Sequence, residues 1–382
     1  MKPIERLLQK EIEKRMKPQK VMLIYGARRV GKTVLLKELI KQQSGKVLLL
    51  NGESSDTLDL LRQRSISHYR QLFSGVDVLA IDEAQHIPEI GAILKLIVDE
   101  VDGIKVIASG SSTFDLQNKA GEPLVGRSTQ FMLTPLSIEE LSQNETGYDT
   151  VMKNEGRVIY GLYPELIGIE RDEEKMEYLK DIVDAYLLRD ILMYDGLKHS
   201  QKLFDLLRLL AWQVGSEVSL DELSKNLSLS RNTVERYMDL LQKVFVIFRI
   251  GGFSKNLRKE VSKSSKWYFQ DTGIRNAVLR DFRPMHLRPE AERGMLWENF
   301  IVSERVKRAL NHRLPVDHYF WRTYDQQEID LIEVEGEKLS AFEIKAGKSS
   351  PKPPKAFREA YPDASFSIIN KDSYLQYILS ER

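Results

Sequence analysis

The stretch "VMLIYGARRVGKT", residues 21–33, decides the fold of the N-terminal part of the chain. It begins as an apolar strand and continues into Gly26 and Gly31, which four residues separate and which Lys32 and Thr33 follow. Glycines let successive backbone N–H groups face one anion, and the N-terminus of the helix expected at 34–42 adds its dipole. The stretch therefore predicts a phosphate-binding loop between a buried strand and a helix.

This loop has the Walker A pattern in its usual context, which predicts nucleotide binding. Lys32 would reach the β- and γ-phosphates of ATP, and Thr33 would coordinate Mg²⁺. The alternative is a chance glycine-rich turn, which the strand, the lysine and the threonine together disfavour. The residues predicted to bind the nucleotide are Gly26, Ala27, Arg28, Arg29, Val30, Gly31, Lys32, Thr33 and Val34.

A second apolar run, "VDVLAIDEAQ" at 76–85, ends in two carboxylates. A continuous apolar run is typical of a buried parallel strand, and ligands bind at the carboxyl ends of such strands. We expect Asp82 to hold Mg²⁺ through water and Glu83 to act as the base for the attacking water.

Two further features follow along the chain. The strand expected at 104–112 ends in small polar residues, where Ser109 or Ser111 would either sense the γ-phosphate or cap the next element. Arg127 follows a glycine and would be either an arginine finger, acting in trans in a ring, or a surface arginine.

Strands that alternate with helices predict a parallel sheet covered on both faces.

Composition narrows the class of protein. A chain of 382 residues without cysteine predicts two or three domains with neither disulfides nor thiolate metal sites, which fits a cytoplasmic protein. The charged N-terminus lacks the apolar core of a signal peptide, and we expect no membrane partner. The net charge is only +1, but residues 249–293 hold eleven Lys and Arg against five Asp and Glu.

The segment 206–253 predicts a winged helix-turn-helix. Ser219, in a capping box with Glu222, and Ser230 would each begin a helix, and a strand at 245–250 and a basic loop follow. In such a fold the second helix enters a DNA groove, whereas other winged helices contact only protein. The predicted DNA contacts are Arg231, Asn232, Thr233, Arg236, Lys255, Arg258 and Lys259, with Lys263 and Lys266 as further phosphate contacts.

Residues 328–347, "EIDLIEVEGEKLSAFEIKAG", predict a hairpin that turns at Gly336. Its register would pair Glu335 with Lys338 and place one face with Asp330, Ile332, Val334, Leu339, Ala341, Glu343 and Lys345. Opposed carboxylates destabilise a sheet unless a cation lies between them. The alternative is a solvated sheet end with a Glu328–Lys345 pair.

Glu298 lies among apolar residues of a helix expected at 290–310, where an acid must be paired or bound to metal. An acid on a helix, an Asp on a strand and Glu-x-Lys on the next strand resemble the PD-(D/E)XK nuclease superfamily. That resemblance implies that Glu298, Asp330 and Glu343 hold Mg²⁺ or Mn²⁺. It also implies that Lys345 positions the attacking water or stabilises charge on the phosphate.

Taken whole, the chain resembles the prokaryotic AAA+-type ATPases of the archaeal-ATPase-like group, which carry a C-terminal domain of unknown function related to those nucleases. The segments that carry the resemblance are "GARRVGKT", "LAIDEAQ", "ASGSS", "VGRSTQFMLTPLSIEEL", "WYFQDTGIRNAVL", "GMLWENFIV" and "YFWRTYDQQEIDLIEVEGEKLSAFEIKAG".

The resemblance implies an α/β protein with an AAA+-type ATPase domain at 1–170, a helical and winged-helix domain at 171–260 and a nuclease-like domain at 261–382. We therefore expect an Mg²⁺-dependent ATPase that binds and processes duplex or branched DNA, assembled as a homo-oligomer such as a hexameric ring. A nucleotide-controlled signalling switch, whose C-terminal parts serve only as scaffolds, is the alternative.

Overall fold

The computed structural model describes residues 4–111, 124–187, 200–254, 265–323, 325–347 and 351–379. The chain divides into two compact units, one from Glu5 to Pro135 and one from Leu136 to Arg382 that also includes Met1–Ile4. Each unit contains one β-sheet. The three domains predicted from the sequence stay a prediction.

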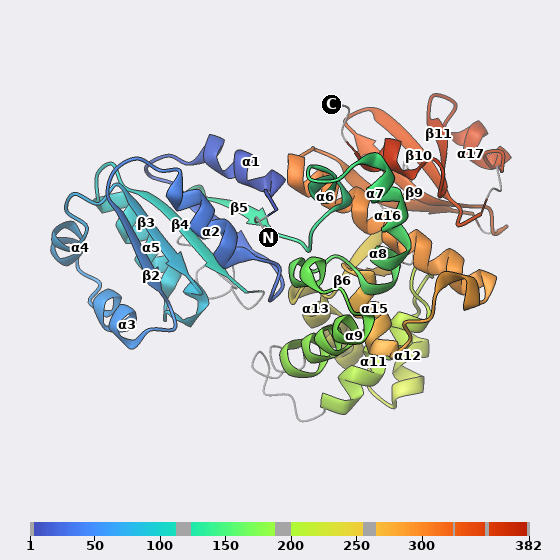
Figure 1. Cartoon of the computed structure of the whole chain (residues 1–382), viewed down its shortest axis with the longest axis horizontal. Coiled ribbons are helices and arrows are strands. Elements are labelled where there is room, and N and C mark those ends of the chain that lie inside the picture. The colour runs from blue at the N-terminus through green and yellow to red at the C-terminus, as the bar shows by residue number, and fades with distance from the viewer. Residues whose placement is uncertain are drawn as a thin grey trace. The chain divides into compact units, whose positions relative to one another are not determined.

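A five-stranded parallel sheet with the order β2-β3-β4-β1-β5 forms the first unit (Figure 1). Its strands are β1 (Val21–Tyr25), β2 (Val47–Asn51), β3 (Val78–Asp82), β4 (Lys105–Gly110) and β5 (Ser128–Met132). Because all the neighbouring strands pair in parallel, their carboxyl ends meet at one edge of the sheet. The predicted parallel sheet is therefore confirmed, and the apolar run of β3 is buried as expected.

Helices cover both faces of this sheet. They are α1 (Leu7–Arg15), α2 (Lys32–Lys41), α3 (Ser55–Arg62), α4 (Ile66–Leu72), the 3₁₀ turn η1 (Ala84–His86) and α5 (Ile90–Glu100). Val21 and Leu23 of β1 share a core with Leu94 and Ile97 of α5. Since side chains alternate along a strand, Met22 and Ile24 point to the opposite face, where α2 contacts β3 and β4.

The second unit begins with a series of helices. They are α6 (Ile138–Ser142), α7 (Gly147–Met152), α8 (Asn154–Tyr160), the 3₁₀ turn η2 (Pro164–Gly168), α9 (Asp172–Asp181), the π-helix η3 (Ile182–Leu187), α11 (Ser200–Trp212), α12 (Leu220–Leu227) and α13 (Arg231–Lys243). The predicted caps are in place, because the side chain of Ser219 accepts from the Glu222 N–H and that of Ser230 from the Thr233 N–H.

A mixed six-stranded sheet with the order β11-β10-β9-β8-β6-β7 forms the rest of the unit. Its strands are β6 (Ile247–Gly252), β7 (Ser265–Phe269), β8 (Asp317–Arg322), β9 (Glu328–Glu335), β10 (Lys338–Ile344) and β11 (Ser365–Ile369). The strand predicted after the second helix of the winged helix is β6, which pairs with β7 and also with β8. The strands of the predicted wing therefore belong to the same sheet as the C-terminal hairpin.

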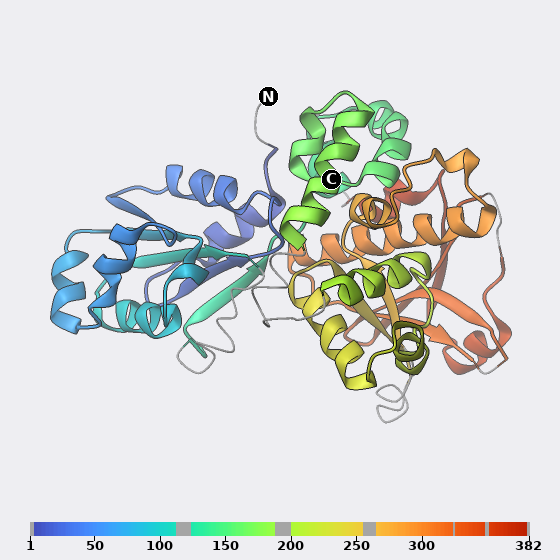
Figure 2. The same cartoon turned by 90° about the horizontal axis from the view of Figure 1, so that it is seen from below.

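Further helices pack on this sheet: α15 (Thr272–Leu279), the 3₁₀ turn η4 (Met285–Leu287), α16 (Glu290–His312), α17 (Lys355–Ala360) and α18 (Tyr374–Ile378). The long helix α16, orange in Figure 2, contacts β7 and β10. Phe357 of α17 and Tyr361, which follows this helix, pack in one core with Trp321 and Ile332 of the sheet. The sheet thus has helices packed on it, as a buried α/β sheet requires.

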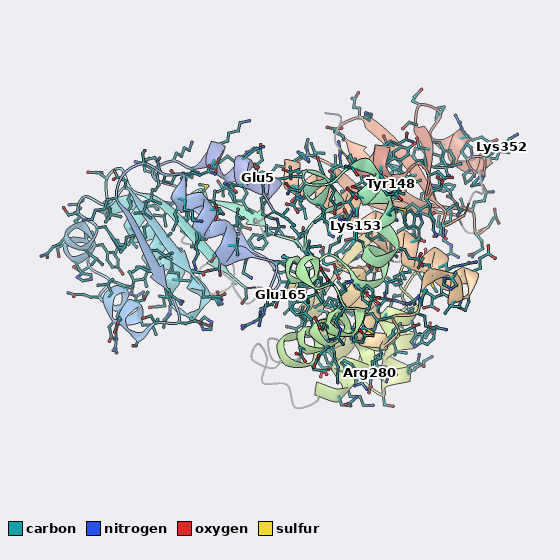
Figure 3. All side chains as sticks on the ribbon, viewed as in Figure 1. Glu5, Tyr148, Lys153, Glu165, Arg280 and Lys352 are labelled. Carbon is teal, nitrogen blue, oxygen red and sulfur yellow. The ribbon has the colours of Figure 1, made fainter. Side chains whose placement is uncertain are left out.

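The motif "QDTGIRNAVL" (270–279) holds the helical part together. Asp271 caps α15 by accepting from the Gly273 and Ile274 N–H groups, and it also accepts from Leu162, which follows α8. The helix ends before Arg280, labelled in Figure 3, whose φ of +54° is left-handed. This motif is accordingly structural in the present fold.

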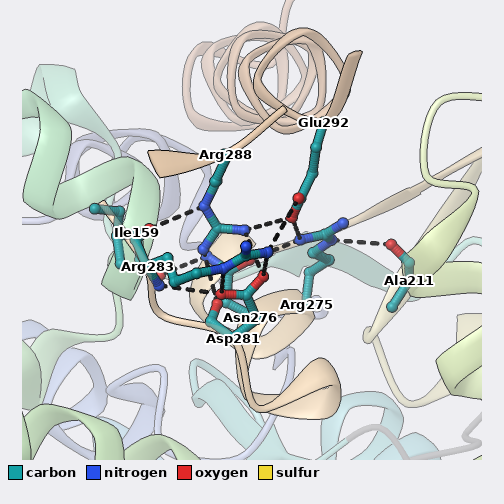
Figure 4. Close-up of polar contacts among 8 residues, drawn as sticks. All are labelled: Ile159, Ala211, Arg275, Asn276, Asp281, Arg283, Arg288 and Glu292. Carbon is teal, nitrogen blue, oxygen red and sulfur yellow. Dashed lines mark hydrogen bonds and ion pairs between the residues drawn. The ribbon is translucent and has the colours of Figure 1, made fainter. Parts of the chain in front are cut away.

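A buried ionic cluster follows α15 (Figure 4). Arg288 donates to Glu292 at 2.6 Å and contacts Asp281 at 3.2 Å, and Arg275 donates to the Ala211 carbonyl at 2.9 Å. Because each charge has a partner of the opposite sign, the cluster can be buried and ties α11, α15 and the start of α16 to one another.

Candidate functional site

The predicted phosphate-binding loop has the backbone that its glycines require. A Cβ atom on Gly26 would lie 2.0 Å from the carbonyl oxygen of Leu133, so only glycine fits where the loop passes the end of β5. Gly31 is left-handed, with φ of +97°, and ends the loop at the first residue of α2. Glycine at these two positions therefore lets the chain turn from β1 into α2.

Lys32 is buried inside this loop, with 5% of its surface exposed. Its Nζ donates to the carbonyl oxygens of Gly26 at 2.9 Å and Ala27 at 2.8 Å. These partners are neutral groups of the loop itself. An anionic phosphate is a stronger partner for an ammonium group than a carbonyl, so the amine is positioned to exchange one for the other.

Arg6 supports the loop from outside, a role that sequence reasoning missed. Its guanidinium donates to the carbonyl oxygens of Val30, at 2.8 Å, and Thr134, at 2.7 Å. Arg6 is buried although it lies in the charged N-terminal segment. Only its position before an amphipathic helix could have suggested that this side chain is held in place. Its partners, Val30 and Thr134, are far away in the sequence.

The neighbouring strand ends bring the predicted acids to the same edge of the sheet. Asp82 accepts a hydrogen bond from the hydroxyl of Ser109 at the end of β4. Gln85, which sequence reasoning missed, donates to Glu83 at 2.5 Å and accepts from the Ser111 N–H at 3.3 Å. Gln85 therefore holds the predicted base and joins it to the end of β4.

Arg127 lies at the other edge of the sheet. Its carbonyl oxygen accepts from the N–H of Val21, the first residue of β1, whereas the phosphate-binding loop follows the last residue of that strand. Five residues of strand separate the two edges by about 17 Å. Its guanidinium instead donates to Asp99 at 2.6 Å. Arg127 therefore does not reach the loop of its own unit.

The C-terminal hairpin has the predicted register. Lys338 pairs with Glu335 and Ala341 with Ile332, and Gly336 has φ of +59° in the turn. One feature was not predicted: between β8 and β9 the register shifts, so that a β-bulge lies at Asp330 and Leu331. Ile329 shares a core with Ile332 although the two are three residues apart, because the bulge resets the alternation of faces. The prediction that Asp330 and Ile332 lie on one face was therefore wrong.

Lysine amines contact the acids of this hairpin. Lys345 Nζ lies 2.6 Å from Glu343 Oε1 and 3.9 Å from Asp330 Oδ2. The Ile344 N–H donates to the same Asp330 oxygen at 2.7 Å. The alternative pair between Glu328 and Lys345 does not form, because Lys345 turns to these two carboxylates instead.

Glu298 of α16 is paired, and its partner was missed. Lys266 Nζ lies 3.2 Å from Glu298 Oε1 and forms a second ion pair with Glu328, while the hydroxyl of Tyr268 donates to Glu298 at 2.7 Å. Lys266 was expected to contact phosphate on a basic surface. That expectation was wrong, because 3% of its side chain is exposed and β7 places it under α16.

Glu298, Asp330, Glu343 and Lys266 form an acidic cluster. Their pKa values follow from burial and from repulsion between the carboxylates. Burial raises the pKa of Glu298 to about 7, against the attraction of Lys266 and with a further contribution from Asp330. Burial also raises the pKa of Asp330 and of Glu343. It opposes the charge of Lys266, but Glu298, Asp330 and Glu328 outweigh it and raise the pKa of that lysine. Lys266 is therefore protonated at neutral pH.

The predicted metal ligands do not fit a metal ion as they are placed. In the ranges that the structure describes, no three His, Cys, Asp or Glu side chains converge as a ligand group. The carboxylates of Glu298, Asp330 and Glu343 each contact an ammonium group instead. Ammonium groups thus stand where a divalent ion would need access to the carboxylate oxygens.

The cluster opens into a pocket of about 450 Å³. Glu298 and Lys345 line it, together with Arg293 of α16 and Lys371. Two acids, Glu290 and Glu298, line the pocket together with these three cationic side chains. The excess of one positive charge suits an anionic ligand with several oxygens, such as a phosphodiester.

The predicted DNA-reading helix, α13, presents part of its predicted face to solvent. Arg231, Asn232 and Arg236 are exposed, and Thr233 is half-buried. Arg231 already contacts Asp221 at 3.4 Å. The charged residues of α12 and α13 balance, four against four: Asp221, Glu222, Glu235 and Asp239 with Lys225, Arg231, Arg236 and Lys243. The other predicted contacts, Lys255, Arg258, Lys259 and Lys263, lie outside the described residues.

A search of the helices in the described ranges finds none with the length and apolarity needed to cross a membrane.

Known families match three parts of the chain. Residues 18–142 match a family described as an AAA domain, and this range contains the whole phosphate-binding loop and the ends of β3 and β4. Residues 153–284 and 293–379 match two domains of unknown function, DUF8612 and DUF4143. The AAA match and the geometry of the loop together support a nucleotide-dependent ATPase.

Two relatives that align over most of this chain are named only as uncharacterized proteins. A protein of Mycobacterium tuberculosis is 26% identical over 91% of this chain and 75% of its own length. One of Methanocaldococcus jannaschii is 22% identical over 89% and 77%. Among solved structures, a RuvB mutant of Thermotoga maritima has a TM-score of 0.29 at 14% identity, covering 64% of this chain and 87% of that one. Domain III of the replication initiation protein DnaA of the same species has a TM-score of 0.29 at 19% identity, over 62% and 89%.

Proposed function

We propose that this protein is an Mg²⁺-dependent ATPase that binds DNA and works as a homo-oligomer. The observation that carries the ATPase is the position of Lys32, held by two loop carbonyls at the same edge of the sheet as the strand end that bears Asp82. In this proposal the loop N–H groups and Lys32 bind the phosphates of ATP.

The residues around the loop supply the rest of the chemistry. Mg²⁺, when bound through Thr33 and Asp82, would neutralise charge on the β- and γ-phosphates. Glu83 would take the proton of the attacking water. Gln85 orients Glu83 through the 2.5 Å hydrogen bond, and its bond to Ser111 makes the base sensitive to the end of β4.

Binding to DNA rests on the pocket of the second unit. Lys345, Arg293 and Lys371 give it the ammonium and guanidinium groups that bind phosphodiester oxygens. The exposed face of α13 is a second candidate surface. Cleavage of DNA, which the resemblance to nucleases leaves open, would need a divalent ion at Glu298, Asp330 and Glu343, and those carboxylates contact lysines instead.

Assembly into a homo-oligomer rests on Arg127. Because it lies at the far edge of the sheet from its own loop, it can serve as an arginine finger only for the nucleotide of another copy. A ring, such as a hexamer, would present each Arg127 to a neighbouring loop.

The salt dependence of DNA binding tests the DNA half of the proposal. Affinity for a fluorescent duplex and a branched DNA is measured between 50 and 200 mM salt, on the wild type, Lys345→Ala and the exposed control Lys355→Ala of α17. We expect the wild type to lose affinity steeply with salt and Lys345→Ala to bind more weakly with a shallower slope. Affinity that does not change with salt, or that Lys345→Ala leaves intact, contradicts binding at this pocket.

One observation favours a second function. The balanced charges of α12 and α13 suit a surface that contacts protein better than one that contacts DNA. In that case nucleotide state would control assembly with a partner protein. This switch would be favoured if DNA changed neither the ATP turnover nor the nucleotide-dependent assembly.

A further inference from the structure

Lys266 crosses the second sheet to reach the acidic cluster. It belongs to β7, the last strand in the sheet order, and pairs with Ile250 of β6. Its Nζ lies 5.6 Å from the centre of the Phe320 ring of β8 and contacts Glu298 of α16 and Glu328 of β9. The amine therefore joins an edge strand, a central strand and the covering helix.

The carboxylates of Glu298 and Asp330 already have donors. Glu298 Oε1 accepts from Lys266 and from the hydroxyl of Tyr268. Asp330 Oδ2 accepts from the Ile344 N–H and lies within 3.9 Å of Lys345. An ion that took these oxygens would have to displace ammonium groups and leave at least one of them buried beside a like charge, which is strongly unfavourable.

The Tyr268 hydroxyl fixes this arrangement further. It donates to the same oxygen of Glu298 as Lys266 does, and it is buried. Two donors on one oxygen orient the carboxylate toward β7. The site is therefore arranged specifically for an ammonium group.

We infer that the Lys266 ammonium group is the permanent cation of this cluster: it takes the place of the divalent ion, so that the pocket binds a phosphodiester without metal and does not hydrolyse it. Only the choice of ligand rests on the proposed DNA binding. The exclusion of divalent ions follows from the contacts of Lys266 itself.

Titration with Mn²⁺ alone tests this inference, on the nucleotide-free full-length chain, with free Mn²⁺ followed by electron paramagnetic resonance. The variants are Lys266→Met, Lys266→Arg, Asp330→Asn and the double variant Lys266→Met/Asp330→Asn. Any Mn²⁺ at the phosphate-binding loop is common to all of them and subtracts out. We expect the wild type, Asp330→Asn and Lys266→Arg to bind equally, and Lys266→Met to gain one site that the double variant loses.

Two results overturn the inference: a wild-type Mn²⁺ site that Asp330→Asn removes, or a folded Lys266→Met that gains no site. Thermal melting shows whether Lys266→Met is folded. Where it is not, the comparison of wild type with Asp330→Asn still decides, because it needs no change at Lys266. Supercoiled DNA with Mn²⁺ gives a second readout, since nicking by the wild type that Asp330→Asn abolishes also contradicts the inference.

Failure here is distinguishable from failure of the proposed function. DNA binding and ATP turnover are measured separately, and neither is needed for the Mn²⁺ titration. A chain that binds Mn²⁺ at Asp330 and also binds DNA would lose only the inference about Lys266.

Discussion

Two buried lysines of this chain, Lys32 and Lys266, have opposite surroundings. Lys32 donates to two neutral carbonyls of a loop that is contiguous in sequence. Lys266 contacts two carboxylates that come from α16 and β9. A lysine held by carbonyls gains when an anion arrives, whereas Lys266, with two carboxylate partners and 3% of its side chain exposed, is already neutralised and closed to a ligand. We therefore expect the ammonium group of Lys32 to serve a ligand and that of Lys266 to serve the fold.

The largest effect should come from removing Lys266 from its two ion pairs. Lys266→Met leaves Glu298 and Glu328 without their shared partner, so we expect the free energy of unfolding to fall by about 3–5 kcal/mol. All four tryptophans, at 212, 267, 297 and 321, belong to the second unit, so urea unfolding followed by their fluorescence reports on that unit. Lys243→Met, an exposed lysine paired with Asp239, should change it by less than about 0.5 kcal/mol. Equal effects would mean that burial of Lys266 contributes nothing.

The contacts of Lys32 should matter for ATP turnover. Lys32→Ala removes the ammonium group that binds the phosphates, so we expect ATP turnover to fall roughly 100- to 1000-fold. Lys41→Ala, an exposed lysine of the same helix, serves as the matched control and should keep wild-type turnover. Unchanged turnover in Lys32→Ala would exclude this loop as the ATP site.

A third ion pair sharpens the comparison through its pH dependence. Burial opposes the charge of Glu333, but its interactions with His318 and Arg305 outweigh it and lower its pKa from 4.5 to about 2. Its stabilisation is present above about pH 4.5 and is lost as the pH falls through 2. We expect Glu333→Gln to remove about 3 kcal/mol of this acid dependence, measured by urea unfolding between pH 2 and 5. The exposed Glu337→Gln should leave the acid limb unchanged, and an unaltered limb in Glu333→Gln would contradict the assignment.

The smallest effect concerns Arg127. Its pair with Asp99 is exposed, so Arg127→Ala should change the free energy of unfolding by less than about 1 kcal/mol. Turnover should be normal at low protein concentration and fall below the wild type only where copies assemble. Arg70→Ala, which removes a similar exposed pair with Glu100, should match the wild type at every concentration. A loss of turnover in the Arg127 variant that does not depend on concentration would contradict a role in trans.

What could be predicted from the sequence was local. The phosphate-binding loop, the strand ending in Asp82 and the hairpin register each follow from residues close together in the chain, where spacing fixes geometry. Helix α16 began where its amphipathic pattern predicted, at Glu290.

What could not be predicted depends on distant partners. Counting charges placed Lys266 on a basic surface, because a count does not reveal that β7 lies under α16, some thirty residues further on. Arg6 reached the loop over a separation of 24 residues. The bulge at Asp330 depends on the pairing with β8, which the hairpin sequence does not contain.

The most direct test measures ATP turnover with and without DNA at low salt, in the wild type, in Lys345→Ala and in the exposed control Lys355→Ala. We predict that DNA raises turnover of the wild type and of Lys355→Ala, and that Lys345→Ala keeps its basal turnover but loses the stimulation. Turnover that DNA does not change in the wild type, or that it stimulates equally in Lys345→Ala, would contradict the coupling of the ATP site to the pocket of the second unit.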